Sequence, residues 1–473
     1  MPLTPRRIVS LAITLVAAAL AQACGGDGGG PSCEGPLFAG ETFFPNAEVE
    51  PSFAVNPADP SNLIGLWQQD RYSTGGARGI SGNVSFDAGK TWTVMTPAKF
   101  SRCTGGRYER ASDPWISISP DGTAHQLGLA FDVSGSGARR AILASRSIDR
   151  GLTWSDPAGL QVDVDPNVAV DKGAITADPN DASAVYAVWD RITALSTPRV
   201  STGPAWFARS LDAGKTWEPA RSIYDPGTNA QTIGNVVAVL PDGTLLNVIE
   251  VITCNVSSPT CPLSITIKVL RSTDKGITWP GPPVLVATVR SVGIFDAKIG
   301  RPVRSGGSLP AIAVDASTGA MYVAWEDSRF TASPPSTEVD GIALSISVDG
   351  GQTWSGTPIQ VNRAPSAQAF TPSVSAAGGR VAVSYYDTRN DDANAAHFLV
   401  NAWLAVSPDR GATWQETALA GPFDVLTAPF AEGYFLGDYE GLAWDGSAFL
   451  AFFAAANSGN ASDPTSILFR RVP

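Results

Sequence analysis

An eight-residue pattern, Ser-x-Asp-x-Gly-x-Thr-Trp, occurs six times and constrains the fold of this 473-residue chain more than any other feature. The copies are Ser85–Trp92, Ser147–Trp154, Ser210–Trp217, Ser272–Trp279, Ser347–Trp354 and Ser407–Trp414. An Asp-x-Gly pair between strand-like runs indicates a tight hairpin, because the carboxylate accepts backbone N–H groups two residues on and Gly adopts a positive φ. The hairpin then presents Thr and a large apolar Trp for packing. We therefore predict a structural role for the pattern.

The spacing of the copies predicts a repeat architecture in one domain, residues 37–473. The pattern's acids are separated by 62, 63, 62, 75 and 60 residues, and they are Asp87, Asp149, Asp212, Asp274, Asp349 and Asp409. This period accommodates four strands with generous loops. The one long interval has no room for a second domain, and we expect only longer loops in it, such as residues 300–308 and 330–339.

A second, looser signature precedes each copy: an apolar run, a turn rich in Asp, Pro and Gly, and a strand that often ends in an aromatic residue and an acid. Such strands include Leu63–Trp67, Val185–Trp189, Met321–Trp325 and Val381–Tyr386. There are seven such hairpins against six copies. We predict an all-β, seven-bladed β-propeller of four-stranded antiparallel blades, whose last blade takes its outer strand from Phe38–Glu50 so that the termini clasp. A six-bladed sialidase-type propeller is the alternative, but it would have to discard one hairpin.

Residues 1–23 are predicted to be a signal peptide. Arg6 and Arg7 precede an apolar run that is too short for a comfortable membrane span, and Ala21-Gln22-Ala23-Cys24 follows. This resembles a bacterial lipoprotein signal, in which Cys24 is acylated and residues 24–36 form a Gly-rich tether, although Leu20 lies four residues before the Cys rather than the preferred three. The alternative is an ordinary secretory signal cleaved after Ala23. We expect a cell-envelope lipoprotein, with a secreted soluble protein as the alternative.

The other four cysteines fit an exported protein. Cys254 and Cys261 are near neighbours that could close a loop, which leaves Cys33 and Cys103 as the other candidate pair. The pairing is not fixed by the sequence, and the oxidising context comes from the export signal rather than from the spacing.

Charge and composition exclude several function classes. A net charge of -11 and an isoelectric point near 4.8 argue against nucleic-acid binding. The only histidines are His125 and His397, so a multi-His metal site or a Ser-His-Asp triad is close to excluded. We predict no cofactor; carboxylates of the first strands are candidate Ca²⁺ ligands, but the spacing of a dedicated Ca²⁺ loop is missing. We expect a monomer that contacts the membrane only through a lipid anchor.

The six copies resemble the Asp-box, or bacterial neuraminidase repeat, of the sialidase superfamily, and the resemblance covers almost the whole mature chain. It implies a propeller in which each box joins the third and fourth strands at the bottom face. The functional face is then built from loops that enter each first strand and leave each second strand. The resemblance is far less specific for a reaction, because Asp-box propellers also occur in glucan hydrolases, sorting receptors and assembly factors.

Polar residues gather at these loop positions. Arginines follow four second strands, and acids, cations and one tyrosine precede first strands; they are Arg71, Arg191, Arg329 and Arg389, and Arg110, Asp113, Asp171, Lys172, Asp438, Tyr439 and Glu440. Arg binds carboxylates through two hydrogen bonds, and carboxylates accept hydrogen bonds from sugar hydroxyls. These rim residues therefore indicate an anionic or polyhydroxylated ligand.

The family resemblance implies roles for some of these residues. Sialidases use an arginine triad, a Tyr nucleophile activated by Glu, and an Asp acid/base. Residue types that match are the four strand-end arginines, Asp113 as the acid, and Tyr439, or Tyr434 with Glu432, as the nucleophile pair. Two departures stand against an active sialidase: no Arg-Ile-Pro segment occurs, and Tyr439 and Glu440 are consecutive, so on a strand they face opposite ways.

Two functions follow as hypotheses. The first is a carbohydrate-directed propeller of the cell envelope, with exo-acting, sialidase-like glycoside hydrolysis as its reaction. The second is a non-catalytic propeller that binds a glycan or a surface protein. The repeated Asp-x-Arg pairs favour a scaffold that ties neighbouring blades, whereas the unrepeated residues Arg110, Asp113, Lys172, Asp438 and Glu440 are better candidates for chemistry.

Overall fold

The computed structural model describes residues 37–134, 137–194, 201–255, 262–331 and 338–473, and this part of the chain is almost entirely β-structure. Its helical elements are short 3-10 turns such as Arg102–Thr104 and Val425–Thr427. Among the described residues, none of the helical segments has the length and apolar character that a membrane span requires. The all-β prediction is confirmed.

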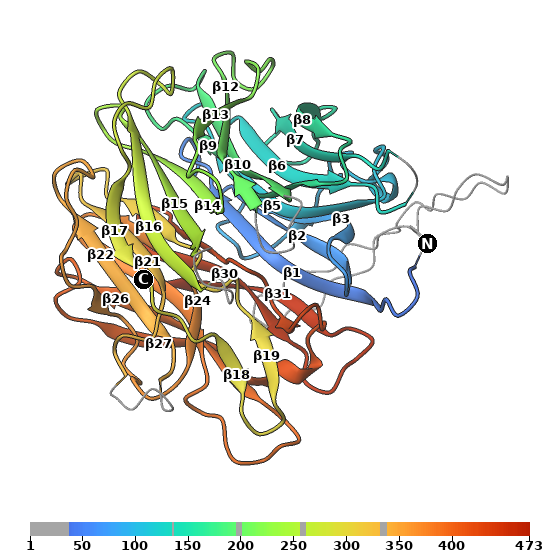
Figure 1. The fold of residues 1–473 in the computed structure, drawn as a ribbon, viewed down its shortest axis with the longest axis vertical. Coiled ribbons are helices and arrows are strands. Elements are labelled where there is room, and N and C mark those ends of the chain that lie inside the picture. The colour runs from blue at the N-terminus through green and yellow to red at the C-terminus, as the bar shows by residue number, and fades with distance from the viewer. Residues whose placement is uncertain (1–36, 135–136, 195–200, 256–261, 332–337) are drawn as a thin grey trace, which may run out of the picture.

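The strands follow one another as antiparallel meanders, coloured in chain order in Figure 1. The first meander contains β1 (Phe43–Val55), β2 (Leu63–Tyr72), β3 (Ala77–Ser85) and β4 (Thr93–Val94). The second contains β5 (Arg110–Ile118), β6 (Ala124–Phe131), β7 (Arg140–Ser147) and β8 (Ala158–Asp163). The third meander contains β9 (Val168–Ala177), β10 (Val185–Ala194), β12 (Ala205–Ser210) and β13 (Arg221–Tyr224). The fourth contains β14 (Ala230–Val239), β15 (Leu245–Cys254), β16 (Leu263–Ser272) and β17 (Val284–Thr288). The short β11 (Ser201–Gly203) bridges β10 and β14.

The C-terminal half continues this pattern. The fifth meander contains β20 (Ala311–Val314), β21 (Met321–Asp327), β22 (Gly341–Ser347) and β23 (Ile359–Gln360). The sixth contains β24 (Ala369–Ala377), β25 (Arg380–Asp387), β26 (Leu399–Ser407) and β27 (Gln415–Asp424). The last contains β29 (Gly441–Trp444), β30 (Phe449–Ala456) and β31 (Thr465–Val472). The four second strands predicted by residue range lie within β2, β10, β21 and β25. These strands read as near-continuous apolar runs because neighbouring sheets cover both of their faces.

The first strands of the meanders form a ring. β1 contacts β5, and the contacts continue through β9, β14, β20, β24 and β29, which in turn contacts β1. Radial sheets whose first strands surround one axis are the arrangement of a β-propeller.

The predicted outer strand from Phe38–Glu50 is not confirmed. Residues 43–50 belong to β1, which pairs with β2, and the described part of the last meander has three strands. Figure 1 nevertheless shows the blue β1 beside the red β31. Side chains join them: the Glu48 carboxylate accepts the Ile467 N–H at 2.9 Å, and the Glu48 N–H donates to the Thr465 hydroxyl at 3.1 Å.

The six repeated turns share one hydrogen-bond pattern. In each copy the Ser hydroxyl donates to the Asp carboxylate and accepts the Gly N–H; in the second copy these distances are 2.7 Å to Asp149 and 2.9 Å from Gly151. The Asp carboxylate accepts the N–H of Thr153, four residues on rather than two as predicted, because the Ser hydroxyl already serves the nearer N–H groups. The positive φ predicted for Gly is confirmed in all six copies.

Each repeated turn lies against the preceding meander. A Cβ at Gly276 would fall 2.4 Å from the Phe207 ring of β12, and the Trp279 ring meets Phe207 edge-on at 5.6 Å. The first copy lies instead on the last meander: a Cβ at Gly89 would fall 2.2 Å from Phe469 of β31, and the Trp92 ring centroid is 5.3 Å from that of Phe469. The turns therefore contribute packing between sheets.

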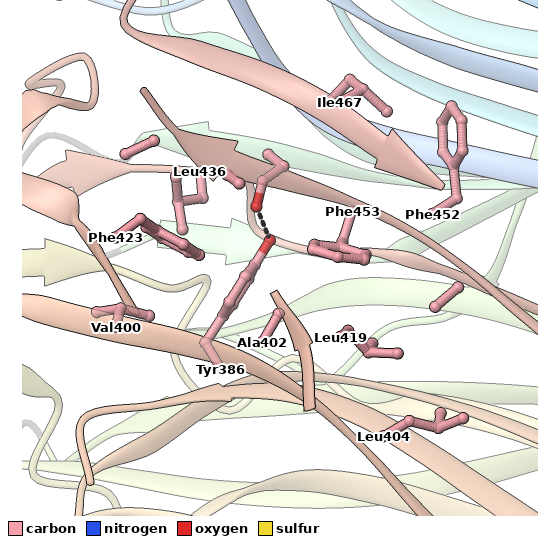
Figure 2. Packing of buried hydrophobic residues seen from close by; sticks show 14 of the residues in the cluster. Tyr386, Val400, Ala402, Leu404, Leu419, Phe423, Leu436, Phe452, Phe453 and Ile467 are labelled. Carbon is pink, nitrogen blue, oxygen red and sulfur yellow. Dashed lines mark hydrogen bonds between the residues drawn. The ribbon is translucent and has the colours of Figure 1, made fainter. Parts of the chain in front are cut away.

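The largest hydrophobic cluster joins the last meander to both of its neighbours. Figure 2 shows Tyr386 of β25 among the apolar side chains of this cluster, with its hydroxyl donating to the Ala454 carbonyl of β30 at 2.6 Å. A buried hydroxyl that finds an acceptor avoids the cost of desolvation, so this bond fixes how the two sheets meet.

The long interval between the fourth and fifth copies contains more than loops. The hairpin of β18 (Ile294–Asp296) and β19 (Arg301–Arg304) pairs in parallel with β28 (Tyr434–Phe435), where the sequence predicts a loop at residues 300–308. Ile294 and Val303 are buried against the hydrophobic cluster of Figure 2, which explains why the segment is ordered as strands. Most of the other predicted loop, 330–339, lies outside the described residues.

Cys254 is disulfide-bonded. Its predicted partner Cys261 lies outside the described residues, as does Cys33, the predicted partner of Cys103. The two pairings, and the acylation of Cys24, therefore stay predictions.

Candidate functional site

Bulges in the first strands create the site. Glu50, Asp113 and Lys172 have φ of 52°, 52° and 43°, a region that non-Gly residues rarely occupy, and the strand register shifts at each position. Glu50 and Asp113 precede prolines, which cannot donate to the sheet ladder. Backbone conformations of this kind cost about 1–3 kcal/mol each and tend to occur at functional positions.

The bulges bring their side chains together around Lys172. Its Nζ atom lies 2.5 Å from Asp438 Oδ2, 3.4 Å from Glu50 Oε1 and 3.9 Å from Asp113 Oδ2. All four side chains are buried. Asp171 joins them, since its carboxylate accepts the Lys172 N–H at 2.9 Å. We call these five residues the Lys172 cluster.

Two arginines flank the Lys172 cluster. Arg304 of β19 forks Asp438, with its Nε atom 3.2 Å and one terminal nitrogen 2.8 Å from the carboxylate oxygens. Arg71, at the end of β2, donates to the Gln68 side chain at 2.7 Å. The guanidinium groups of Arg71 and Arg304 lie 4.8 Å and 4.6 Å from the ring centroid of Phe435, so both cations contact this ring.

The carboxyl groups of the Lys172 cluster have pKa values shifted in opposite directions. Burial, reinforced by the Asp113 charge, raises the pKa of Glu50 well above its usual range, and burial also raises the pKa of Asp171 to about 6. Burial opposes ionisation of Asp113 and Asp438 too, but the Lys172 ammonium outweighs it and lowers both pKa values. Arg304 adds to the effect at Asp438. The cluster thus combines proton-holding and ionised carboxyl groups, which is the arrangement that acid–base catalysis uses.

Lys172 itself remains an ammonium. Burial lowers its pKa, but the surrounding carboxylates, Asp113 first, outweigh burial and raise the pKa well above the usual value. The Lys172 ammonium thus already lies among the first-strand carboxylates that are the candidate Ca²⁺ ligands. A separate group, Asp391, Asp392 and His397, has metal-ligating side chains, but the Lys298 ammonium lies 2.7 Å from the Asp391 carboxylate.

The Lys172 cluster opens into a cleft of about 850 Å³. Asp171, Lys172 and Asp438 line its floor together with Arg304, whose side chain is 30% exposed. The walls come from the β18–β19 hairpin, the loop at residues 305–309 and described residues around 338 and 368. A ligand in the cleft would therefore reach Asp171 and Arg304 directly.

Tyr439 and Glu440, each predicted as a candidate catalytic residue, have partners on different strands. The Tyr439 ring packs on Trp115 with centroids 5.2 Å apart, and its hydroxyl donates to the Pro114 carbonyl at 3.1 Å. Burial and the nearby carboxylates, Glu50 first, raise the pKa of Tyr439 well above its usual value. The Glu440 carboxyl accepts the Ser384 hydroxyl at 2.9 Å, and burial raises its pKa to about 8. Both residues precede β29 rather than lying in a strand, and their partners come from β5 and β25.

The alternative pair, Tyr434 and Glu432, lies at the cleft margin. The Tyr434 hydroxyl accepts a hydrogen bond from Arg301 at 3.1 Å, and Glu432 is exposed and lines the cleft.

Four of the six predicted substrate-binding residues pair with other groups. Arg191 pairs with Asp163 at 2.8 Å, Arg329 with Asp327 at 2.7 Å, and Arg389 with Glu416 at 2.6 Å. The Arg191 pair joins β10 to β8 of the preceding meander, as the scaffold interpretation expects, whereas the Arg329 and Arg389 pairs lie within one meander. The fourth, Arg110, is fully buried and pairs with Glu41 at 2.8 Å, where it holds the segment before β1. Of the predicted set, Arg71 and Lys172 belong to the site.

Sequence reasoning missed Glu50 and Arg304. Glu50 was assigned to an outer strand, although Glu50-Pro51 repeats the acid–proline pair of Asp113-Pro114 and could have indicated a second bulge. Arg304 lies in a segment that was predicted to be a loop, and we find no sequence signal for its approach to Asp438.

Comparisons with known proteins give only remote similarities. No protein-family model matches the sequence, and no curated protein matches it significantly. Similar solved structures include a Hadza microbial sialidase (16% identity, TM-score 0.48, covering 88% of this chain and 74% of that chain) and a Penicillium chrysogenum α-L-arabinanase (16% identity, TM-score 0.48, covering 72% and 91%). A polysaccharide lyase of family PL25, an ulvan lyase, has 12% identity and a TM-score of 0.49, covering 91% and 95%. Similarity at this level assigns neither a family nor an activity.

Proposed function

We propose that this chain is an exported, seven-bladed β-propeller that binds carbohydrate in the cleft above the Lys172 cluster and hydrolyses a glycosidic bond there. The blade count is supported by the succession of meanders that begin with β1, β5, β9, β14, β20, β24 and β29. The reaction is supported by one observation above all: proton-holding and ionised carboxyl groups meet at the floor of an open cleft.

Asp171 is the candidate general acid. It is partly exposed in the cleft, and a pKa of about 6 lets it hold a proton near neutral pH. It would protonate the glycosidic oxygen as the bond to the anomeric carbon breaks, and it would accept a proton from the water that attacks this carbon. The ionised Asp438, fixed by Lys172 and Arg304, would stabilise positive charge that develops on the sugar ring.

The geometry supports carboxylate chemistry better than a tyrosine nucleophile. The Tyr439 hydroxyl is engaged with the Pro114 carbonyl, and its raised pKa disfavours the phenolate that would attack a sugar. The engagement of Arg191, Arg329 and Arg389 with strand-end carboxylates likewise leaves no support for their action as a substrate clamp.

A panel of aryl glycosides and a fluorogenic sialoside tests the proposal. We expect turnover of at least one substrate by the full chain, with a loss of about 100-fold or more for Asp171→Asn. The activity of the wild type should fall as the pH rises above about 6, because Asp171 loses its proton. Asp156→Asn, which alters an exposed ion pair, serves as the control. Absence of turnover on the whole panel would overturn hydrolysis.

A non-catalytic glycan-binding propeller is the second candidate. It is favoured by the double engagement of Asp438, which a ligand would have to share with Lys172 and Arg304. Binding of an oligosaccharide that the protein leaves intact, with binding abolished by Arg304→Ala, would support this candidate.

We also propose that the chain is a monomer held at the cell envelope by a lipid on Cys24. The support is the sequence around Cys24, which lies outside the described residues. Stable anchoring would then depend on the acyl chains. A Cys24→Ser protein that still partitions with membranes would contradict the anchor.

A further inference from the structure

The cleft walls carry more acidic than basic groups. Six ionisable side chains line the described cleft: the carboxyl groups of Asp171, Glu338, Glu432 and Asp438, and the cations Lys172 and Arg304. Even when Asp171 holds its proton, the carboxylates of Glu338, Glu432 and Asp438 outnumber the two cations by one. An anionic sugar that enters the cleft would meet a net negative potential, which lowers both its affinity and its association rate.

Both cations are already engaged by carboxylates of the Lys172 cluster. Arg304 uses two nitrogens for a fork on Asp438, and the Lys172 ammonium lies within 4 Å of Asp438, Glu50 and Asp113. A ligand carboxylate could gain the Lys172 ammonium or the bidentate fork of Arg304 only by displacing Asp438, which would then be left buried without its partners. Breaking a buried charge pair is strongly unfavourable, so exchange of one carboxylate for another gives no net gain.

The β18–β19 hairpin supplies an apolar surface at the same cleft. Phe295 lines the cleft and is 45% exposed, and Val292 beside it is also exposed. An aromatic ring open to a cleft offers a flat apolar face on which the C–H face of an uncharged sugar ring can pack.

Hydrogen bonds with neighbouring side chains hold the backbone at Phe295 in place. The Gln368 side chain accepts the Phe295 N–H at 2.7 Å and donates to the Phe295 carbonyl at 3.0 Å. The Asp340 carboxylate accepts the N–H groups of Val292 and Gly293 at 3.0 Å and 2.8 Å. A surface that is ordered before binding loses little conformational entropy when a ligand arrives.

Resting on the proposed carbohydrate function, we infer that the cleft takes an uncharged glycan, one sugar of which packs on Phe295, and that it disfavours sialosides and uronides. The combination of an acidic wall, engaged cations and an exposed phenylalanine whose backbone is held in place suits an uncharged polyhydroxylated ligand. The sugar hydroxyls would donate to Asp171 and Glu338, and no ligand charge would need a partner.

The experiment is a binding panel on the full chain by titration calorimetry. It compares neutral oligosaccharides with sialylated and uronate-containing ones, including the methyl ester of each uronide as an uncharged counterpart. We expect binding of a neutral glycan, and tighter binding of the ester than of its acid at low salt, with a smaller difference at high salt. Tight binding of acidic glycans alone would overturn the inference while leaving the carbohydrate function standing. Absence of binding to every glycan would overturn both.

Two sets of variants test the ring contact with Phe295 and the effect of wall charge separately. Phe295→Ala should weaken neutral-glycan binding about 3- to 10-fold, as expected for loss of a ring contact. Phe86→Ala, a similarly exposed phenylalanine in the first repeated turn, should leave affinity unchanged. Glu338→Gln combined with Glu432→Gln should narrow the preference for the ester over the acid. Unchanged affinity in Phe295→Ala would overturn the packing contact, and an unchanged preference in the double variant would overturn the role of wall charge.

Discussion

Lys172 illustrates how one buried cation can organise an acidic site. Without it, four carboxyl groups from strands distant in the sequence would repel one another in a region of low dielectric. With it, Asp113 and Asp438 stay ionised while Glu50 and Asp171 retain protons at higher pH. The division of protonation states therefore depends on the ammonium rather than on the carboxyl groups alone.

The first prediction concerns the ion pair at the centre of the site. Asp438→Asn leaves the buried Lys172 and the partly exposed Arg304 without their common partner, so we expect the free energy of unfolding to fall by about 3–5 kcal/mol. Asp156→Asn removes the partner of Lys99 in an exposed pair and should cause no measurable change. Urea denaturation of both variants makes the comparison, and similar losses in the two would contradict a special role for burial.

The second prediction concerns the pH dependence of stability. Folding raises the pKa of Glu440 from about 4.5 to about 8, so the folded state holds this proton more tightly than the unfolded state. Its stabilisation is fully present below about pH 4.5 and is lost as the pH rises towards 8. Glu440→Gln should therefore flatten the decline between pH 5 and 8 by up to about 1.4 kcal/mol per pH unit.

The matched control for this experiment is a carboxyl group shifted in the opposite direction. Hydrogen bonds from Thr216 lower the pKa of Asp212 to about 2, so its contribution is lost only as the pH falls below its ordinary value near 3.8. Asp212→Asn should leave the slope between pH 5 and 8 unchanged. Free energies of unfolding measured at four pH values test both variants, and an unaltered slope for Glu440→Gln would contradict the assignment.

At the scale of elements, the repeated turn depends more on its buried serine than on its exposed residues. Ser147→Ala removes the acceptor of the Gly151 N–H and a donor to Asp149, and we expect a loss of about 1–3 kcal/mol. The equivalent Ser347→Ala should cost a similar amount. The two losses should add because the turns share no partners: Gly151 lies against Ile64 and Val84, and Gly351 lies against Leu246 and Met321. Ile148→Ala, at the exposed position between Ser147 and Asp149, should change stability by less than about 0.5 kcal/mol. Thermal and urea unfolding would check the series, and a larger effect at Ile148 would contradict it.

The turns and the site differ in how far the sequence could predict them. All the groups that hold a repeated turn lie within eight consecutive residues, so Ser147, Asp149 and Gly151 indicate the geometry directly. The Lys172–Asp438 contact joins residues 266 positions apart, and it requires knowledge of how the sheets are placed around the axis. The position of Asp438 near the rim was predictable from the repeat, but its partners were not.

The N-terminal strand and the β18–β19 hairpin show the same limit. Residues 43–50 have an apolar pattern suited to either an outer or an inner strand, and pairing with β2 rather than β31 is decided by contacts outside the segment. Residues 294–304 carry Gly and Pro that favour a loop, but burial of Ile294 and Val303 outweighs that preference. Tertiary packing overrides local propensity in both cases.

At the scale of the whole molecule, we expect closure of the ring to contribute strongly to stability. A propeller whose ends are joined leaves only short sheet edges exposed, whereas an open one would expose the edges of its first and last sheets. Here side chains join the two ends of the chain. The Trp92 ring packs edge-on against Phe469, and the Glu48 carboxylate accepts a backbone hydrogen bond from β31. We therefore predict that damage at this joint loosens both ends of the chain.

Phe469→Ala tests this prediction by hydrogen exchange measured peptide by peptide. Truncation of a buried phenylalanine costs about 3–5 kcal/mol, and we expect faster exchange in β1–β2 as well as in β30–β31, with β14–β17 still protected. Phe207→Ala is the matched control, because Phe207 meets Trp279 edge-on as Phe469 meets Trp92, but at a junction inside the chain. It should destabilise β10 and β12 while the chain ends stay protected. If exchange in β1 is unchanged in Phe469→Ala, the ends are not coupled through this contact and closure must depend on other residues.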